Sequence, residues 1–157
     1  WWPQAFLGIA FNWGALMLWA AHSGQMGWAP VVLYVAGICW TLFYDTIYAH
    51  QDIDDDALIG VKSTARLFGD NTVHWLKYFM AITVSLMAIA IILALLPNAS
   101  ILALILALAG PWAMGWHMTW QLRGFDQSDS TRMLQLFWAN RDTGLIPLIF
   151  FCVALLA

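Results

Sequence analysis

Residues 75–96 read WLKYFMAITVSLMAIAIILALL, and this stretch decides the class of fold. Its only charged residue is Lys77, close to its start. An α-helix needs about 20 consecutive apolar residues to cross the hydrocarbon core of a bilayer. A transmembrane β-strand would instead show a short alternating pattern, which is absent here. We therefore expect a membrane-spanning helix over about 75–96.

Four more apolar stretches accompany this one, at about residues 3–21, 30–49, 101–121 and 133–157. The whole chain is 62 % hydrophobic and only 10 % charged. A soluble domain usually carries about 25 % charged residues, so this sequence cannot build an ordinary water-facing surface. We predict an all-α fold, a polytopic bundle of about five transmembrane helices, with residues 1–157 forming a single domain in the lipid bilayer.

The basic residues follow the joins between these spans. Residues 50–74 and 122–132 carry two Lys or Arg each, whereas residues 22–29 and 97–100 carry none. Five helices of alternating direction put the second and fourth joins on the same face. Basic loops stay on the cytoplasmic side of a membrane, so we expect the 50–74 loop on the cytoplasmic or matrix side. Six scattered basic residues form no basic face and indicate no nucleic-acid partner.

The charges concentrate in residues 44–70, YDTIYAHQDIDDDALIGVKSTARLFGD. All nine acidic residues of the chain are Asp, and five of them lie between Asp45 and Asp56. If the second helix continued through Asp56, Asp45, Tyr48, Asp52 and Asp56 would share one stripe. Like charges on one stripe repel, and a divalent cation between them would remove the repulsion. Oxygen-rich clusters without sulfur suit hard cations such as Mg²⁺.

Bound Mg²⁺ usually shares its coordination positions between one or two carboxylates, waters and substrate phosphates. Lys62 and Arg66, one helical turn apart, could hold phosphate oxygens. The stretch therefore indicates a Mg²⁺–diphosphate site at a membrane face. Spacing alone leaves two other interpretations open, a solvated acidic loop that caps a helix and an ion pathway.

The same stretch resembles the second aspartate-rich motif of the UbiA-type intramembrane aromatic prenyltransferases. That pattern is Tyr-Asp-Thr, Tyr-Ala, Asp-x-x-x-Asp, Gly-x-Lys-Ser-Thr-Ala and Phe-Gly, and residues 44–69 carry every element in order. Within the family, the stretch is most similar to the 4-hydroxybenzoate polyprenyltransferases of ubiquinone synthesis. Residues 1–17 resemble the family's fifth span, and residues 136–148 resemble the start of its last one.

The resemblance implies a fold of nine helices, of which this chain supplies helices five to nine. The first aspartate-rich motif and the arginine that holds the acceptor's carboxylate belong to the other part. Together with a start at Trp1 that lacks an initiator Met, this leads us to expect a C-terminal half that is inactive alone.

As function, the resemblance implies a Mg²⁺-dependent enzyme of the bacterial inner or mitochondrial inner membrane. It would transfer a polyprenyl group from polyprenyl diphosphate to 4-hydroxybenzoate. The implied site residues are Asp52 and Asp56 as Mg²⁺ ligands, Asp45 and Tyr48 beside them, and Lys62 and Arg66 on the diphosphate.

Three alternatives remain at this point. The first is an enzyme of the same superfamily that uses another acceptor, such as homogentisate, naphthoate or haem. A cation transporter or channel with an acidic mouth is the second, and it predicts carboxylates near the middle of the membrane. A non-catalytic helical scaffold is the third, and it leaves the aspartates unexplained.

Polar residues inside the spans carry further expectations. Asn12 is costly in lipid unless it hydrogen-bonds to another helix or lines a cavity. We expect Asn140, Arg141 and Asp142 near the cytoplasmic end of the last helix, with Arg141 pairing with Asp142 or facing the diphosphate.

Overall fold

The structure, a computed structural model, describes residues 1–96 and 98–157, and within these residues it contains helices and turns but no strand. The elements are α1 (Pro3–Phe11), α2 (Trp13–Ser23), α3 (Trp28–Ala49), α4 (Ile53–Ile59), α5 (Thr64–Phe68), a 3₁₀ turn η1 (Gly69–Asn71), α6 (Thr72–Leu95), α7 (Ile101–Arg123) and α8 (Ser130–Ala154). Residue 97, part of the third predicted join, lies outside the described residues.

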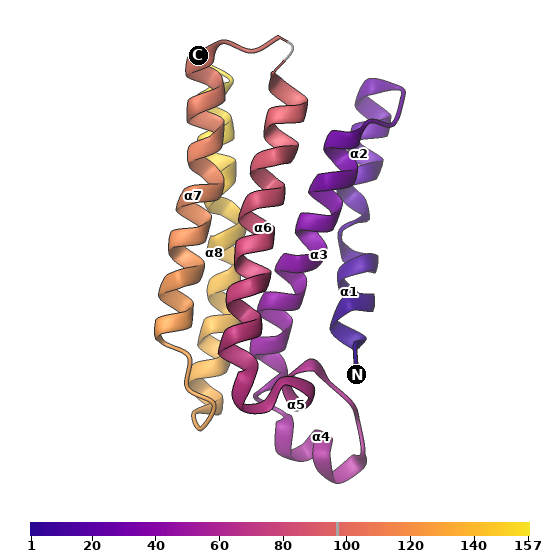
Figure 1. The fold of residues 1–157 in the computed structure, drawn as a ribbon, viewed down its shortest axis with the longest axis vertical. Helices are drawn as coiled ribbons and strands as arrows, with labels where there is room; N and C mark the ends of the chain where they lie inside the picture. The colour runs from indigo at the N-terminus through magenta and orange to yellow at the C-terminus, as the bar shows by residue number, and fades with distance from the viewer. Residues whose placement is uncertain (97) are drawn as a thin grey trace.

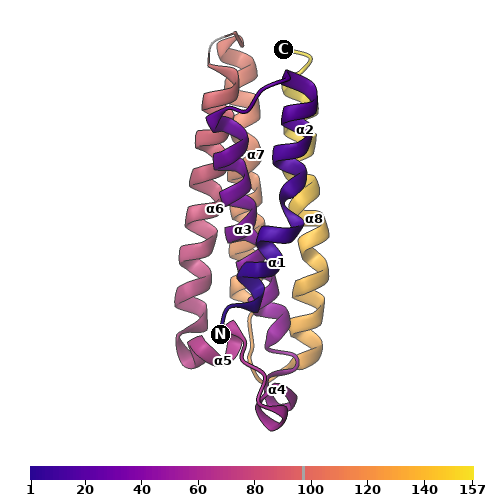
Figure 2. The same cartoon turned by 90° about the vertical axis from the view of Figure 1, so that its right-hand side faces the viewer.

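Five stretches are long and apolar enough to cross a membrane: Pro3–Ser23, Trp28–Ala49, Thr64–Leu95, Ile101–Arg123 and Ser130–Ala154. The prediction of an all-α bundle with about five spans is therefore confirmed. Figures 1 and 2 show the long helices side by side, with α1 and α2 forming one interrupted span. The assignment of these spans to helices five to nine of a larger fold stays a prediction.

Both basic joins lie at the same end of the bundle. In Figure 1, α4 and α5 lie at the lower end, where the turn between α7 and α8 and the N-terminus are also found. The C-terminus and the turn after α6 lie at the opposite end. This arrangement follows from the two helices, α6 and α7, that separate the joins, because two crossings return the chain to the same end. Which side of the membrane this end faces stays a prediction.

Helix α3 is central, because it packs against α1, α6 and α8, while α7 packs against α6 and α8. Large apolar side chains such as Phe43, Leu76 and Met114 are fully buried between these helices. Other large apolar side chains point outward: Trp112 is 78 % exposed and Trp116 is 75 % exposed. An apolar outer surface is what a bundle in lipid requires, since the bilayer takes the place of water.

Asn12 separates α1 from α2. Its Nδ2 donates hydrogen bonds to the carbonyl of Gly8 at 2.7 Å and to Thr41 Oγ1 on α3 at 3.0 Å. Gly37 makes room for this contact, because a Cβ there would collide with the Asn12 amide. The expectation that Asn12 bonds to another helix is thus confirmed.

Arg141 and Asp142 do not lie where the sequence suggested. They are the twelfth and thirteenth residues of α8, which runs over 25 residues from Ser130 to Ala154. The expectation that they lie near the cytoplasmic end is therefore wrong, because α8 begins before Met133 and forms a continuous helix through Pro147. The expected pairing is confirmed, with Arg141 Nε 2.8 Å from Asp142 Oδ1.

Candidate functional site

The aspartate-rich segment leaves the bundle at the end of α3. This helix stops at Ala49, His50 and Gln51 form a turn, and Asp52 takes the N-cap position of α4. The supposition that one helix continues through Asp56 is therefore wrong, and with it the single stripe of Asp45, Tyr48, Asp52 and Asp56.

Contacts of His50 explain why the helix stops. The ring is 3 % exposed, its Nε2 lies 3.1 Å from Thr72 Oγ1 at the start of α6, and it stands edge-on to Phe125. These contacts hold the chain against the end of the bundle, where the next segment turns away. Burial also lowers the pKa of His50 to about 4, so the ring is neutral at pH 7.

Asp52 and Asp56 remain one helical turn apart on α4. The Asp56 N–H donates to the Asp52 carbonyl at 2.8 Å, and both residues are half-buried. Asp54 and Asp55 are exposed. Asp45 is also half-buried, one turn before the end of α3. The burial pattern thus separates the proposed Mg²⁺ ligands from their exposed neighbours.

No three His, Cys, Asp or Glu side chains within residues 1–96 and 98–157 are grouped so as to hold a metal ion. Asp45 therefore does not complete a three-carboxylate cage with Asp52 and Asp56. The donor set still fits Mg²⁺, since this ion takes one or two carboxylates and fills its other positions with water and phosphate oxygens.

Three buried polar side-chain atoms in the described chain have no hydrogen-bond partner: His50 Nδ1, Gln51 Oε1 and Ser63 Oγ. All three belong to the segment that carries Asp52 and Asp56. Buried polar atoms are normally paired, and an unpaired one in a native structure calls for an unseen water, ion or ligand. Their concentration here shows that this end of the bundle has room for water or a polar ligand to pair with them.

The two cations of the segment lie together. Arg66 Nη1 donates to the Asp56 carbonyl at 3.2 Å and also to the Val61 carbonyl, which closes the chain after α4. Lys62 Nζ lies 5.5 Å and Arg66 Cζ lies 5.8 Å from the centre of the Trp1 ring. They are not one turn apart on a helix as expected, because α5 begins only at Thr64. Lys62 is exposed, so its ammonium is accessible to a ligand.

Sequence reasoning missed a buried polar tie that fixes the start of α5. Thr46 Oγ1 on α3 lies 2.7 Å from Thr64 Oγ1, and the Thr64 N–H donates to Gln4 Oε1 on α1 at 3.1 Å. All three residues are buried. The signal in the sequence was a lone Gln in the first apolar span, which lipid does not tolerate without a partner.

A cavity of about 880 Å³ lies between the α1–α2 break, α3 and α8, and it reaches the middle of α8 at Arg141 and Asp142. Its walls include Asn12, Trp40, Thr41 and Tyr44. The rings of Trp40 and Tyr44 meet edge-on with centroids 5.6 Å apart, and the Tyr44 ring lies 5.9 Å from that of Phe137.

Aromatic contacts continue from the cavity to the aspartate-rich end. Phe137 of α8 also packs on Tyr48, with ring centroids 4.7 Å apart. Tyr48 therefore packs on α8. The side chains that line this path come from helices α3 and α8, which are far apart in sequence.

The chain matches the model of the UbiA prenyltransferase family over residues 1–141. It belongs to the UbiA prenyltransferase family. This membership confirms the resemblance found in the aspartate-rich stretch. No solved structure matches the chain.

Curated relatives in this family carry the name 4-hydroxybenzoate polyprenyltransferase, mitochondrial. One from Dictyostelium discoideum is 40 % identical over 97 % of this chain and 32 % of its own length. One from Rattus norvegicus is 42 % identical over 92 % of this chain and 37 % of its own length. One from Aedes aegypti is 62 % identical over 50 % of this chain and 18 % of its own length. The chain thus spans about a third of the length of the relatives that match nearly all of it.

Proposed function

We propose that the whole protein transfers a polyprenyl group from polyprenyl diphosphate to 4-hydroxybenzoate in ubiquinone biosynthesis. This chain would supply one aspartate-rich side of the active site and would be inactive alone. The names of the relatives support the reaction. The observation that carries the assignment to these residues is the half-buried pair Asp52 and Asp56, set among the unpartnered polar atoms at the end of the bundle.

In this proposal Asp52 and Asp56 hold Mg²⁺, with Asp45 close by on α3. The bound ion would act as a Lewis acid that stabilises negative charge on the departing diphosphate. Lys62 contacts the diphosphate oxygens, since its ammonium is exposed. Arg66 has a weaker claim because its guanidinium already bonds two backbone carbonyls. Its role is to keep α4 and its aspartates in place.

The aromatic path between the aspartate-rich end and the cavity suits the rest of the reaction. The allylic C–O bond breaks, a carbon–carbon bond forms ortho to the phenol hydroxyl, and the ring proton is lost. Tyr44, Tyr48 and Phe137 present apolar rings along this path, which exclude water from a reactive allylic cation. An aromatic face also attracts a cation by its quadrupole.

Family membership favours an enzyme over a cation transporter or a scaffold. Another aromatic acceptor within the superfamily remains the alternative, and it is separated by offering homogentisate and 4-hydroxybenzoate to the same preparation. We further propose that the aspartate-rich end faces the cytoplasm or the mitochondrial matrix. In a cysteine-free background, a thiol reagent added from that side should label Asp55→Cys but not Gln25→Cys, and the reverse pattern would overturn this orientation.

The function is tested with the full-length protein in liposomes, supplied with polyprenyl diphosphate and 4-hydroxybenzoate. Mass spectrometry should detect the prenylated acid with Mg²⁺ and not after chelation. Asp52→Asn should lower the rate about 100-fold or more, because a metal ion supplies several kcal/mol of charge stabilisation. Asp54→Asn is the matched control and should stay within a few-fold of wild type, because Asp54 is exposed. Equal losses from both variants would contradict the assignment.

A further inference from the structure

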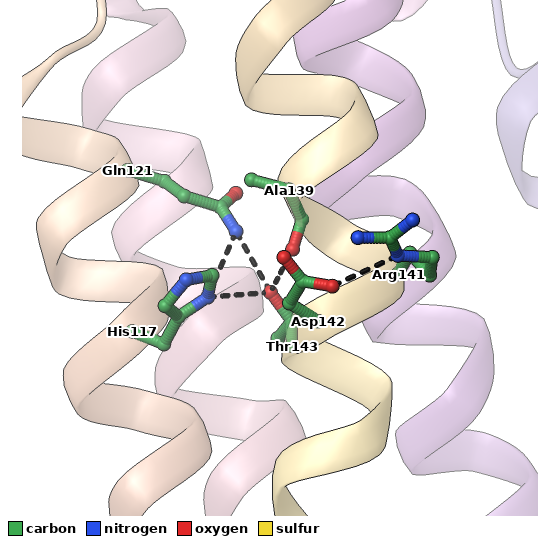
Figure 3. A network of polar contacts seen from close by, with 6 residues as sticks. All are labelled: His117, Gln121, Ala139, Arg141, Asp142 and Thr143. Atoms are coloured by element: carbon green, nitrogen blue, oxygen red, sulfur yellow. Dashed lines mark hydrogen bonds and ion pairs between the residues drawn. The ribbon is translucent and has the colours of Figure 1, made fainter.

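A buried polar network joins α7 to α8 inside the membrane-spanning part of the bundle. Gln121 Nε2 donates to Thr143 Oγ1 at 2.8 Å, and Asn140 Nδ2 donates to Gln121 Oε1 at 3.0 Å. His117 Nδ1 lies 2.8 Å from the same Thr143 hydroxyl. Figure 3 shows Gln121 and His117 reaching from α7 toward Thr143, while Arg141 extends from α8 on the side away from α7. The network therefore fixes which face of α8 turns toward α7.

Both amides of this network are fully used. Gln121 accepts from Asn140 and donates to Thr143. Asn140 also donates to the Leu136 carbonyl at 3.0 Å, and its Oδ1 accepts from Trp40 Nε1 of α3 at 3.2 Å. A satisfied buried network has one arrangement, because flipping either amide would leave buried donors and acceptors unpaired. The orientation of the Asn140 amide is thus set by Gln121 together with the Leu136 carbonyl.

The Asn140 amide orients the Trp40 indole through a hydrogen bond. The indole N–H of Trp40 bonds to Asn140, and the opposite edge of the ring lies over Gly144, where a Cβ would come within 2.7 Å of Trp40 Cη2. The ring is therefore held at both ends, by a hydrogen bond on one side and by close packing on the other. Trp40 also forms a wall of the cavity between the α1–α2 break, α3 and α8.

The residues that line the cavity indicate which substrate would bind against the Trp40 ring. Asn12, Thr41, Asn140, Arg141 and Asp142 line it together with aromatic rings. An isoprenoid tail has no hydrogen-bonding group and needs no polar wall. A phenolic acid has both an aromatic ring and polar substituents, so it matches this mixed lining.

We propose that Asn140, oriented by Gln121, is a positioning residue that holds the Trp40 indole as a fixed wall against the aromatic acceptor. This inference rests on the proposed function, in which the cavity receives the acceptor. Gln121 is fully buried and does not line the cavity, and Asn140 lines it with its amide bonded to Trp40. Their effect reaches the reaction through the orientation of the Trp40 ring, so it falls on the acceptor and not on the polyprenyl diphosphate.

The test uses steady-state kinetics of the full-length enzyme. Trp40→Phe removes the indole N–H together with part of the ring system, whereas Asn140→Leu deletes the hydrogen-bond partner and keeps the whole Trp40 ring. Asn140→Leu should raise the KM for the acceptor about fivefold, which is what one buried hydrogen bond contributes, and Trp40→Phe should raise it at least as much because it also shrinks the wall. The KM for polyprenyl diphosphate should stay within twofold of wild type. The double variant should show no further increase over Trp40→Phe, since that change already removes the bond that Asn140→Leu breaks.

Thr119→Val on α7 is the matched control. Thr119 also makes hydrogen bonds inside the bundle, to the Gly115 carbonyl and to Met80 of α6, but on the side of α7 that faces α6. This variant should lose some stability and keep both KM values. An unchanged acceptor KM in Trp40→Phe would overturn the inference, as would equal increases for both substrates. Wild-type enzyme that fails to prenylate any aromatic acid would instead contradict the proposed function.

Discussion

Replacing Gly37 by Ala should destabilise the protein by breaking the contact between the α1–α2 break and α3. A Cβ built on Gly37 would lie 2.6 Å from Asn12 Cγ and 3.2 Å from Asn12 Cβ. The Asn12 side chain would have to rotate away. It would then lose its hydrogen bonds to the Gly8 carbonyl and to Thr41 Oγ1.

The magnitude follows from these two bonds. Each buried hydrogen bond contributes about 1 kcal/mol, so losing both costs about 2 kcal/mol. Replacing Gly by Ala inside a helix returns about 0.5–1 kcal/mol. The expected net loss in the free energy of unfolding is therefore about 1–1.5 kcal/mol. Gly14→Ala on α2 is the matched control, because no atom lies within 4 Å of the added Cβ, and it should be neutral or slightly stabilising.

The measurement is the free energy of unfolding of the full-length protein in micelles, obtained by titration with denaturing detergent. An Asn12→Ala background gives a second check, because the collision with the amide is gone there and only the 3.2 Å contact with the Cβ of residue 12 remains, so Gly37→Ala should cost clearly less than in wild type. If Gly37→Ala is as stable as Gly14→Ala in the wild-type background, the Asn12 contact does not hold α1 against α3 and the reasoning is wrong.

Two further predictions concern the aspartate-rich end of the bundle. Gln4→Leu should lower the free energy of unfolding by about 1–3 kcal/mol, because the buried Thr64 N–H loses its acceptor; Gln4→Glu, which keeps an acceptor, should lose less, and equal losses would contradict this role. In the turn after α7, the side chain and backbone N–H of Ser128 donate to Asp126 and hold the pKa of its carboxyl below the ordinary 3.8. Ser128→Ala should raise that pKa in an NMR titration. A carboxyl whose pKa is lower in the folded than in the unfolded state stabilises the fold at pH values above its unfolded pKa, and this contribution is lost as the pH falls through the folded pKa. Ser128→Ala reduces this contribution, so the variant should lose less stability on acidification. An unmoved pKa of Asp126 would refute this.

The sequence by itself determined the number and type of the spans and the end at which the basic joins meet. In lipid every backbone N–H and C=O must be paired within the segment, so about 20 apolar residues leave a helix as the only outcome. The order and spacing of residues 44–69 also indicated the family, because that motif lies within one contiguous stretch.

Only the tertiary structure decided where α3 stops and which helix faces meet. The turn after Ala49 depends on His50 meeting Thr72, and the cavity wall depends on Trp40 meeting Asn140, 100 positions later. Hydropathy reports how each residue partitions between water and lipid, and it says nothing about which polar side chain a distant helix will offer. The polar contacts inside this bundle were therefore fixed only when the helices packed, which is also why the single stripe of aspartates expected from one continuous helix does not form.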